Sequence, residues 1–107
     1  MTIDHIDKID LIGIENTTGN VILTISDHLN WEDHLSHLKV LQEKINTYLR
    51  FIESDEIYQS YPSARGKKII IEVVGKYDLT LEARVFYFDA NLIIQKMGSE
   101  IRFTQLK

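Results

Sequence analysis

The chain has 107 residues, of which 44% are hydrophobic and 26% are charged, and it contains one proline and no cysteine. This length and composition are typical of a single globular domain over residues 1–107 and not of a disordered chain. The net charge of −4 disfavours nucleic acid as a partner, and the lack of cysteine excludes disulfides, thiolate nucleophiles and the common structural zinc sites.

The amino terminus and the apolar runs indicate where the protein works. The first ten residues, MTIDHIDKID, are acidic and contain no uninterrupted apolar stretch, so they do not resemble a signal peptide. No apolar run approaches the length that crosses a bilayer, so we expect no membrane partner. These features predict a cytoplasmic protein of bacterial type.

Two strands joined by a turn are predicted first. Residues 8–14 are rich in isoleucine and leucine, and residues 21–26 place apolar side chains at every second position. The polar stretch between them ends near Gly19, which can adopt a positive φ. The pattern predicts a β-hairpin.

A long helix is predicted for residues 31–54. Asn30 is a suitable N-cap, and Asp33 near the start favours the helix dipole. Glu43 and Lys44 fall on the polar face, which predicts an exposed ion pair of little energetic weight. The residues that follow the 3.6-residue period and should face the core are Trp31, Leu35, Leu38, Leu41, Ile45, Tyr48, Leu49 and Ile52.

The middle of the chain and its end contain two further strands. Residues 55–66 include Pro62 and read as a loop with a short helical turn at residues 56–60. Residues 67–74 form the clearest strand, because isoleucine and valine recur on one face. The last strand is predicted at residues 101–106.

Residues 80–97 allow two interpretations. As a strand, residues 79–87 alternate between apolar and polar side chains. As a helix, the segment has one broad apolar face made of Ala83, Phe86, Tyr87, Ala90, Ile93, Ile94 and Met97, and a second apolar stripe made of Leu81, Val85, Phe88 and Leu92. We favour the helix, because residues 86–97 fit no period-two pattern and Gly98 is placed to end it.

The predicted element order is therefore ββαβαβ. This order indicates an α+β fold, a two-layer sandwich in which a four-stranded sheet carries two long helices on one face. The helical connections between parallel strands should be right-handed.

Histidines and an aspartate cluster before and within the start of the first helix. His34 and His37 are three residues apart, so they can converge, and Asp27, His28 and His37 are the candidate ligands of a divalent metal. The usual helical zinc pattern, two histidines four apart around a glutamate, is absent. In the alternative, structural interpretation, Asp27 bonds backbone donors, His28 packs on Trp31, and His37 bonds to the sheet or the loop.

Two aromatic residues and a basic cluster are candidates for ligand binding. Trp31 and Tyr61 could floor a small-molecule site between sheet and helices, although a tryptophan at a helix start more often covers the end of a core. Arg65, Lys67 and Lys68 form the only basic cluster, which could bind a phosphate or an acidic peptide. The alternative is that these cations are solvated surface.

The second apolar stripe at residues 80–97 carries the main functional hypothesis. A surface helix needs only one apolar face, so this stripe should be exposed unless residues 55–66 fold over it. Exposed apolar patches mark contact sites, and such a helix could pair with its counterpart in a symmetric dimer. No nucleophile or phosphate-loop motif is present. We therefore expect a non-enzymatic interaction module, without a cofactor, that binds a protein partner or a second copy. The alternative is a metal-binding protein or a metal-dependent enzyme that uses Asp27, His28 and His37.

Several motifs spread along the chain form one pattern. They are Ile12-Gly13-Ile14, Thr18-Gly19, Leu23-Thr24-Ile25-Ser26-Asp27-His28-Leu29, Trp31, His37-Leu38, Leu41-Gln42-Glu43-Lys44-Ile45-Asn46, Tyr48-Leu49, Phe51-Ile52-Glu53-Ser54, Tyr61-Pro62 and Lys76-Tyr77. With this pattern, nearly the whole chain resembles a small bacterial family known only as a domain of unknown function. The resemblance implies a stand-alone bacterial domain and a helix at residues 80–97, and it implies no activity. The family usually has polar residues at the positions of the second stripe, so the stripe would be particular to this protein or its near relatives.

Overall fold

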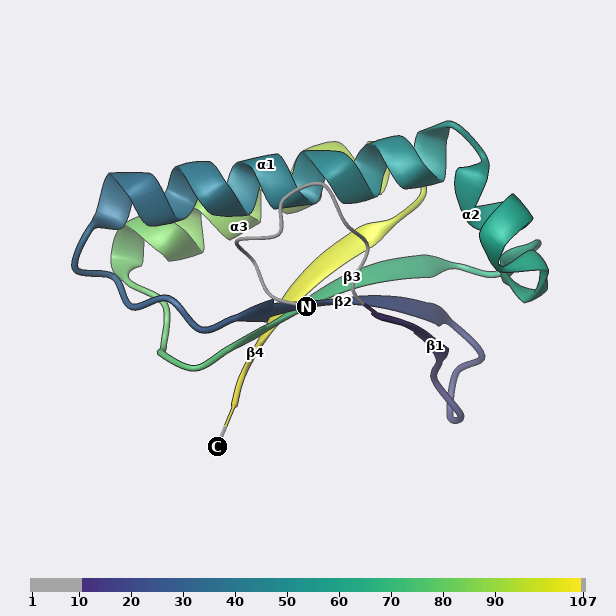
Figure 1. Ribbon diagram of the computed structural model, residues 1–107, viewed down its shortest axis with the longest axis horizontal. Coiled ribbons are helices and arrows are strands. Elements are labelled where there is room, and N and C mark those ends of the chain that lie inside the picture. Colours follow the sequence, from purple (N-terminus) through teal and green to yellow (C-terminus); the bar gives the residue numbers. More distant parts are fainter. Residues whose placement is uncertain (1–10, 107) are drawn as a thin grey trace.

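The computed structural model describes residues 11–106 and arranges them as a sheet covered by helices (Figure 1). The elements are β1 (Leu11–Ile14), β2 (Val21–Asp27), α1 (His34–Glu53), α2 (Glu56–Ser60), the 3₁₀ helix η1 (Pro62–Ala64), β3 (Ile69–Gly75), α3 (Leu81–Lys96) and β4 (Glu100–Gln105). The predicted order ββαβαβ is confirmed, the helical turn predicted at residues 56–60 is α2, and η1 is an addition before β3. Residues 8–10 of the first predicted strand lie outside the described residues.

The strands lie in the sheet in the order of the chain, β1-β2-β3-β4. β1 is antiparallel to β2, whereas β3 is parallel to both of its neighbours. α1 and α3 make the two parallel crossovers and lie on the same face of the sheet (Figure 1). Since both crossovers advance in the same direction across the sheet, they have the same hand. The predicted α+β architecture is confirmed.

The core lies between this face of the sheet and the helices. Every second residue of β2 and β3 points into it, which explains the alternation of apolar residues in the sequence. The helix residues that complete it come mainly from α1, with α2 closing one end (Figure 1). Its most deeply buried members include Val21, Leu23, Ile25, Leu41, Tyr48, Ile57, Ile71 and Val73.

The start of α1 differs from the prediction. The helix begins at His34, and its N-cap is Asp33, whose side chain accepts a hydrogen bond from Ser36 N at 3.3 Å. Asn30 instead accepts from Glu32 N at 3.0 Å, which makes a separate turn before the helix. Asn30 and Asp33 are both suitable capping residues, and Asp33, which directly precedes the helix, is the N-cap.

The buried face of α1 is also rotated relative to the predicted stripe. Leu35, expected in the core, is 79% exposed. The prediction that Lys44 belongs to an exposed ion pair is wrong, because Lys44 is fully buried and its ammonium lies 5.6 Å from the centre of the Tyr48 ring. Apart from Ile45, the buried residues from His37 to Phe51 follow alternating steps of four and three, and this spacing turns Lys44 inward.

Two glycines have the conformations that the sequence predicts. Gly19 closes the β1–β2 connection with a φ of +77°, and Gly98 ends α3 with a φ of +84°. The N–H of Gly98 donates to the carbonyl of Gln95 at 3.0 Å. Both positions lie in the left-handed region, which glycine adopts without strain.

Candidate functional site

Residues 81–96 are helical, so the strand interpretation of this segment is wrong. Thr80 is the N-cap of α3, and its hydroxyl accepts a hydrogen bond from Ala83 N at 3.2 Å. Ala83, Tyr87 and Ile94 are the buried residues of the helix. The broad apolar face is therefore turned toward the sheet as predicted, apart from Ile93, which is 61% exposed.

The second apolar stripe lies on the outer side of α3. We call Leu81, Val85, Phe88 and Leu92 the α3 stripe; their exposed fractions lie between 49% and 75%. The predicted exposure of the stripe is confirmed. Residues 55–66 do not cover it, because α2 and η1 pack together beyond the carboxyl end of α1 (Figure 1).

A shallow groove runs between α3 and the edge strand β4. Its volume is about 330 Å³, and its apolar lining includes Leu79, Tyr87, Phe88, Ile101 and Phe103. Phe88 belongs to both the groove and the α3 stripe. The stripe and the groove therefore form one continuous surface that reaches from the outer side of the helix to the edge of the sheet.

A buried aspartate–histidine pair lies where β2 ends and α1 begins. His37 Nε2 is 2.6 Å from Asp27 Oδ2, and His37 Nδ1 is 2.9 Å from the carbonyl oxygen of Asn30. Both side chains are almost completely buried. Both ring nitrogens face oxygens, so each contact needs its own proton. The pair is either an imidazolium facing a carboxylate or a neutral imidazole facing a protonated aspartate.

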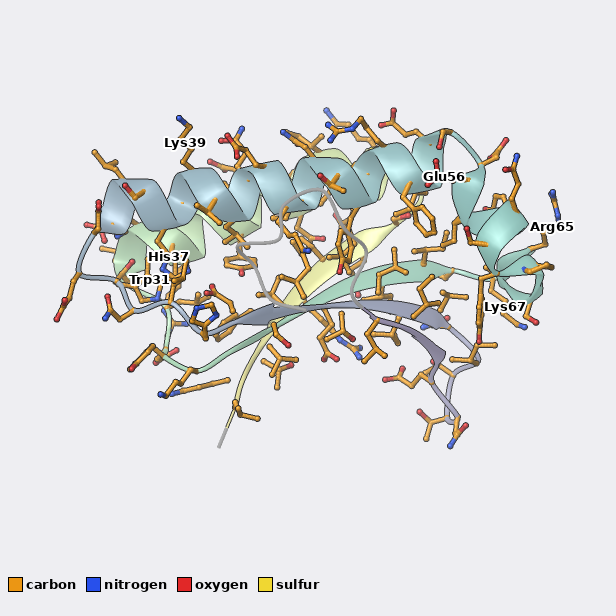
Figure 2. The ribbon with its side chains drawn as sticks, in the orientation of Figure 1. Trp31, His37, Lys39, Glu56, Arg65 and Lys67 are labelled. Carbon is orange, nitrogen blue, oxygen red and sulfur yellow. The ribbon has the colours of Figure 1, made fainter. Side chains whose placement is uncertain are left out.

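The surroundings of this pair match the structural interpretation of both residues. Asp27 Oδ1 accepts a hydrogen bond from Leu29 N at 3.1 Å, as predicted for a turn before the helix. His37 bonds to the sheet and to the loop, also as predicted. Trp31 stacks on His37 with ring centres 3.6 Å apart, whereas the sequence pattern favours His28 for this contact (Figure 2).

The structure does not bring the three candidate metal ligands together. Asp27 and His37 are in contact, but His28 is exposed. Within residues 11–106, no three or more histidine, cysteine, aspartate or glutamate residues are grouped so that they could hold a metal ion.

Tyr87 has an unusual environment that the sequence does not reveal. Its side chain is 8% exposed, and its hydroxyl has no hydrogen-bond partner among the described residues. Burial raises the pKa of the Tyr87 phenol well above its usual value, and the nearby charge of Asp27 raises this pKa further. Helical periodicity predicts that Tyr87 is buried, but only the packing shows that its hydroxyl is left without a partner.

The aromatic residues expected to floor a ligand site lie far apart. Trp31 precedes α1 at one end of the long axis of the molecule, and Tyr61 follows α2 at the other end (Figures 1 and 2). Arg65 lies at the same end as Tyr61 (Figure 2). The structure therefore does not form the predicted site between Trp31 and Tyr61.

Each cation of the basic cluster has a partner within the chain. The Arg65 guanidinium lies 4.9 Å from the centre of the Tyr58 ring. Lys67 Nζ donates to the carbonyl of Ser63 at 2.8 Å, and Lys68 Nζ lies 3.6 Å from a carboxylate oxygen of Glu100. These contacts favour the solvated-surface interpretation of the cluster.

The sheet face opposite the helices carries an ion-pair network that sequence reasoning missed. Arg102 donates to Glu15 and to Glu72, each at 3.0 Å. A hydrogen bond from Thr18, followed by that from Arg102, lowers the pKa of Glu15. Arg102 lies on the edge strand β4 and Glu15 directly follows the opposite edge strand β1, so the network reaches across the face of the inner strands.

None of the helices within residues 11–106 combines the length and the apolar character needed to cross a membrane.

Comparison with known proteins identifies the family of the chain. No curated protein and no solved structure matches the chain. A family model does match, over residues 1–107, and the chain therefore belongs to that family of unknown function, DUF6572.

Proposed function

We propose that this protein is a non-enzymatic interaction module that associates with a second copy of itself through the α3 stripe. The observation that carries the proposal is the exposure of four large apolar side chains on one side of one helix. A contiguous apolar surface on a protein of this size marks a contact site. The proposal includes the bacterial, cytoplasmic setting expected from the sequence.

The size of the stripe sets the strength expected of this contact. At about 25 cal/mol per Å², the ~1.5–3 kcal/mol gained by burying one such side chain corresponds to roughly 60–120 Å². Four side chains that are 49–75% exposed therefore offer roughly 150–300 Å² in each copy. Burying both stripes gains roughly 7–15 kcal/mol, against an association cost of about 4–15 kcal/mol. The stripe alone therefore roughly offsets the association cost, and a weak dimer with a dissociation constant between about 1 µM and 1 mM needs a further contribution from the surface beside the stripe.

The test compares matched substitutions on the two long helices. Leu81 and Leu35 both lie in the first turn of a helix and are similarly exposed, at 75% and 79%. Leu81→Asp places a charge in the α3 stripe, whereas Leu35→Asp places it on α1. An aspartate near a helix start is compatible with the helix dipole, so both variants should stay folded.

We expect light scattering to show that Leu81→Asp and Phe88→Asp shift the protein toward the monomer, while Leu35→Asp behaves like the wild type. Circular dichroism spectra that match the wild type establish that the variants are folded. Equal weakening by Leu81→Asp and Leu35→Asp would show that the stripe has no special role in association.

A further inference from the structure

The free edge of β4 has a specific pattern of backbone groups. β4 is an outermost strand in the sheet of the described residues, with β3 as its neighbour. The N–H of Leu106 donates to Gly75 on β3 at 2.7 Å, while the N–H of Ile101 points the other way and donates to Asn91 Oδ1 at 3.1 Å. Since successive backbone groups alternate along a strand, the N–H and C=O groups of Phe103 and Gln105 point away from the sheet.

Among residues 11–106, only one half of this edge is left open. Asn91 of α3 occupies the outward N–H of Ile101, so α3 covers the start of β4. The half that includes Phe103 and Gln105 lies beside the groove that Leu79 and Phe88 help to line. An unpaired strand edge next to an apolar groove is the arrangement to which another strand adds.

We propose that the second copy adds its β4 antiparallel to this open half, so that one sheet runs through both copies. In the register that uses the outward groups, Phe103 of each copy pairs with Gln105 of the other, and Thr104 lies on the two-fold axis facing its counterpart. This pairing makes about four main-chain hydrogen bonds. It deepens the proposed function and rests on it, since the edge and the α3 stripe then form one interface.

Two observations favour a second copy as the occupant. The stripe offers only roughly 150–300 Å², whereas a stable interface buries about 800 Å² per partner, so a self-associating stripe needs additional surface. The edge beside it supplies that surface and is self-complementary, as a two-fold interface requires. Opposed side chains are also compatible: threonine faces threonine, phenylalanine faces glutamine, and Arg102 faces Leu106, so no like charges meet.

Single-cysteine crosslinking tests the pairing directly. The chain contains no cysteine, so any disulfide-linked dimer must form through the introduced residue. Opposed residues in a non-hydrogen-bonded pair have Cα atoms about 4.5 Å apart, within the range of about 4.4–6.8 Å that a disulfide spans. Ser26→Cys is the matched control, because Ser26 is exposed on the same face of the sheet but lies on the inner strand β2.

Under mild oxidation we expect Thr104→Cys to form a covalent dimer at least about tenfold faster than Ser26→Cys, since only Thr104 lies on the two-fold axis. Gln105→Pro removes an outward N–H without removing a β3–β4 hydrogen bond, and should weaken the dimer. If Phe88→Asp dissociates the wild-type dimer but Thr104→Cys crosslinks no faster than the control, the edge pairing is wrong while the proposed function stands. A wild type that is monomeric at all concentrations overturns both.

Discussion

The buried pair of Asp27 and His37 should make a large, mutually dependent contribution to stability. Asp27→Ala removes the partner of His37 Nε2 and the acceptor of Leu29 N–H. His37→Ala leaves Asp27 Oδ2 without its 2.6 Å contact. Breaking a buried pair of this kind costs about 3–5 kcal/mol, so each variant should lose about that much of the free energy of unfolding. A domain of this size has only about 5–15 kcal/mol in total.

The variant that carries both substitutions isolates the energy of the contact between Asp27 and His37 from that of their other contacts. Once one partner is absent, removal of the other no longer breaks the contact between Asp27 and His37, and only the separate backbone hydrogen bond of the second residue is lost. The double variant should therefore lose about 2–3 kcal/mol less than the sum of the two single losses. His37→Ala should cost slightly more than Asp27→Ala through its lost stacking on Trp31, about 0.5–1.5 kcal/mol.

Urea unfolding at neutral pH measures these values, with the fluorescence of Trp31 as the signal. Trp31 is the only tryptophan of the chain and stacks on His37, so its emission reports both unfolding and the loss of the pair. Unchanged slopes against urea would show that the transitions are comparable. Strictly additive losses, or a loss below about 1 kcal/mol in either single variant, would refute the coupling inferred from the geometry.

Three further predictions follow from individual sites. Burial raises the pKa of the Tyr87 phenol, so the folded protein favours the protonated phenol. The stability that results is fully present below about pH 10 and is lost as the pH rises through the pKa of the folded state. Tyr87→Phe should remove this loss of stability at alkaline pH. In urea unfolding at pH 7, its free energy of unfolding should equal that of the wild type or exceed it by about 1 kcal/mol, whereas a clearly lower value would mean that the hydroxyl has a partner. A Cβ at Gly75 would lie 2.5 Å from Phe103 Cε1, so Gly75→Ala should cost about 1–3 kcal/mol, and Phe103→Leu in the same chain should recover part of it; no loss would mean that the ring moves freely. Zinc should leave the melting temperature unchanged, because both ring nitrogens of His37 already contact oxygens, of Asp27 and of Asn30; a rise at stoichiometric zinc would restore the metal hypothesis.

Local periodicity was sufficient for the elements and for the main candidate surface. β2 and β3 alternate apolar and polar residues because one face of the sheet lies on the core. α3 has two apolar faces but can bury only one against the sheet, so exposure of the α3 stripe followed from residue spacing. Gly98 ended the helix where its left-handed conformation is required.

The features that sequence reasoning missed depend on tertiary packing. The rotation of α1 about its axis is set by its packing on the sheet, and this rotation decides that Lys44 is buried and Leu35 exposed. Asn30 and Asp33 are both suitable N-caps, and the path of the loop before α1 decides that Asp33 is the cap. The contacts of Arg102 with Glu72 on the neighbouring strand and with Glu15 after β1 depend on how the chain is arranged across the sheet, which single-sequence patterns do not contain.

The central claim is that the α3 stripe holds two copies together, and the mass of the wild-type protein in solution tests it most directly. Sedimentation equilibrium over a range from about 1 µM to 1 mM covers the affinities expected for a weak dimer. The account predicts a reversible rise from the mass of one chain, 12.5 kDa, to that of two chains. A mass of one chain at every concentration would contradict it.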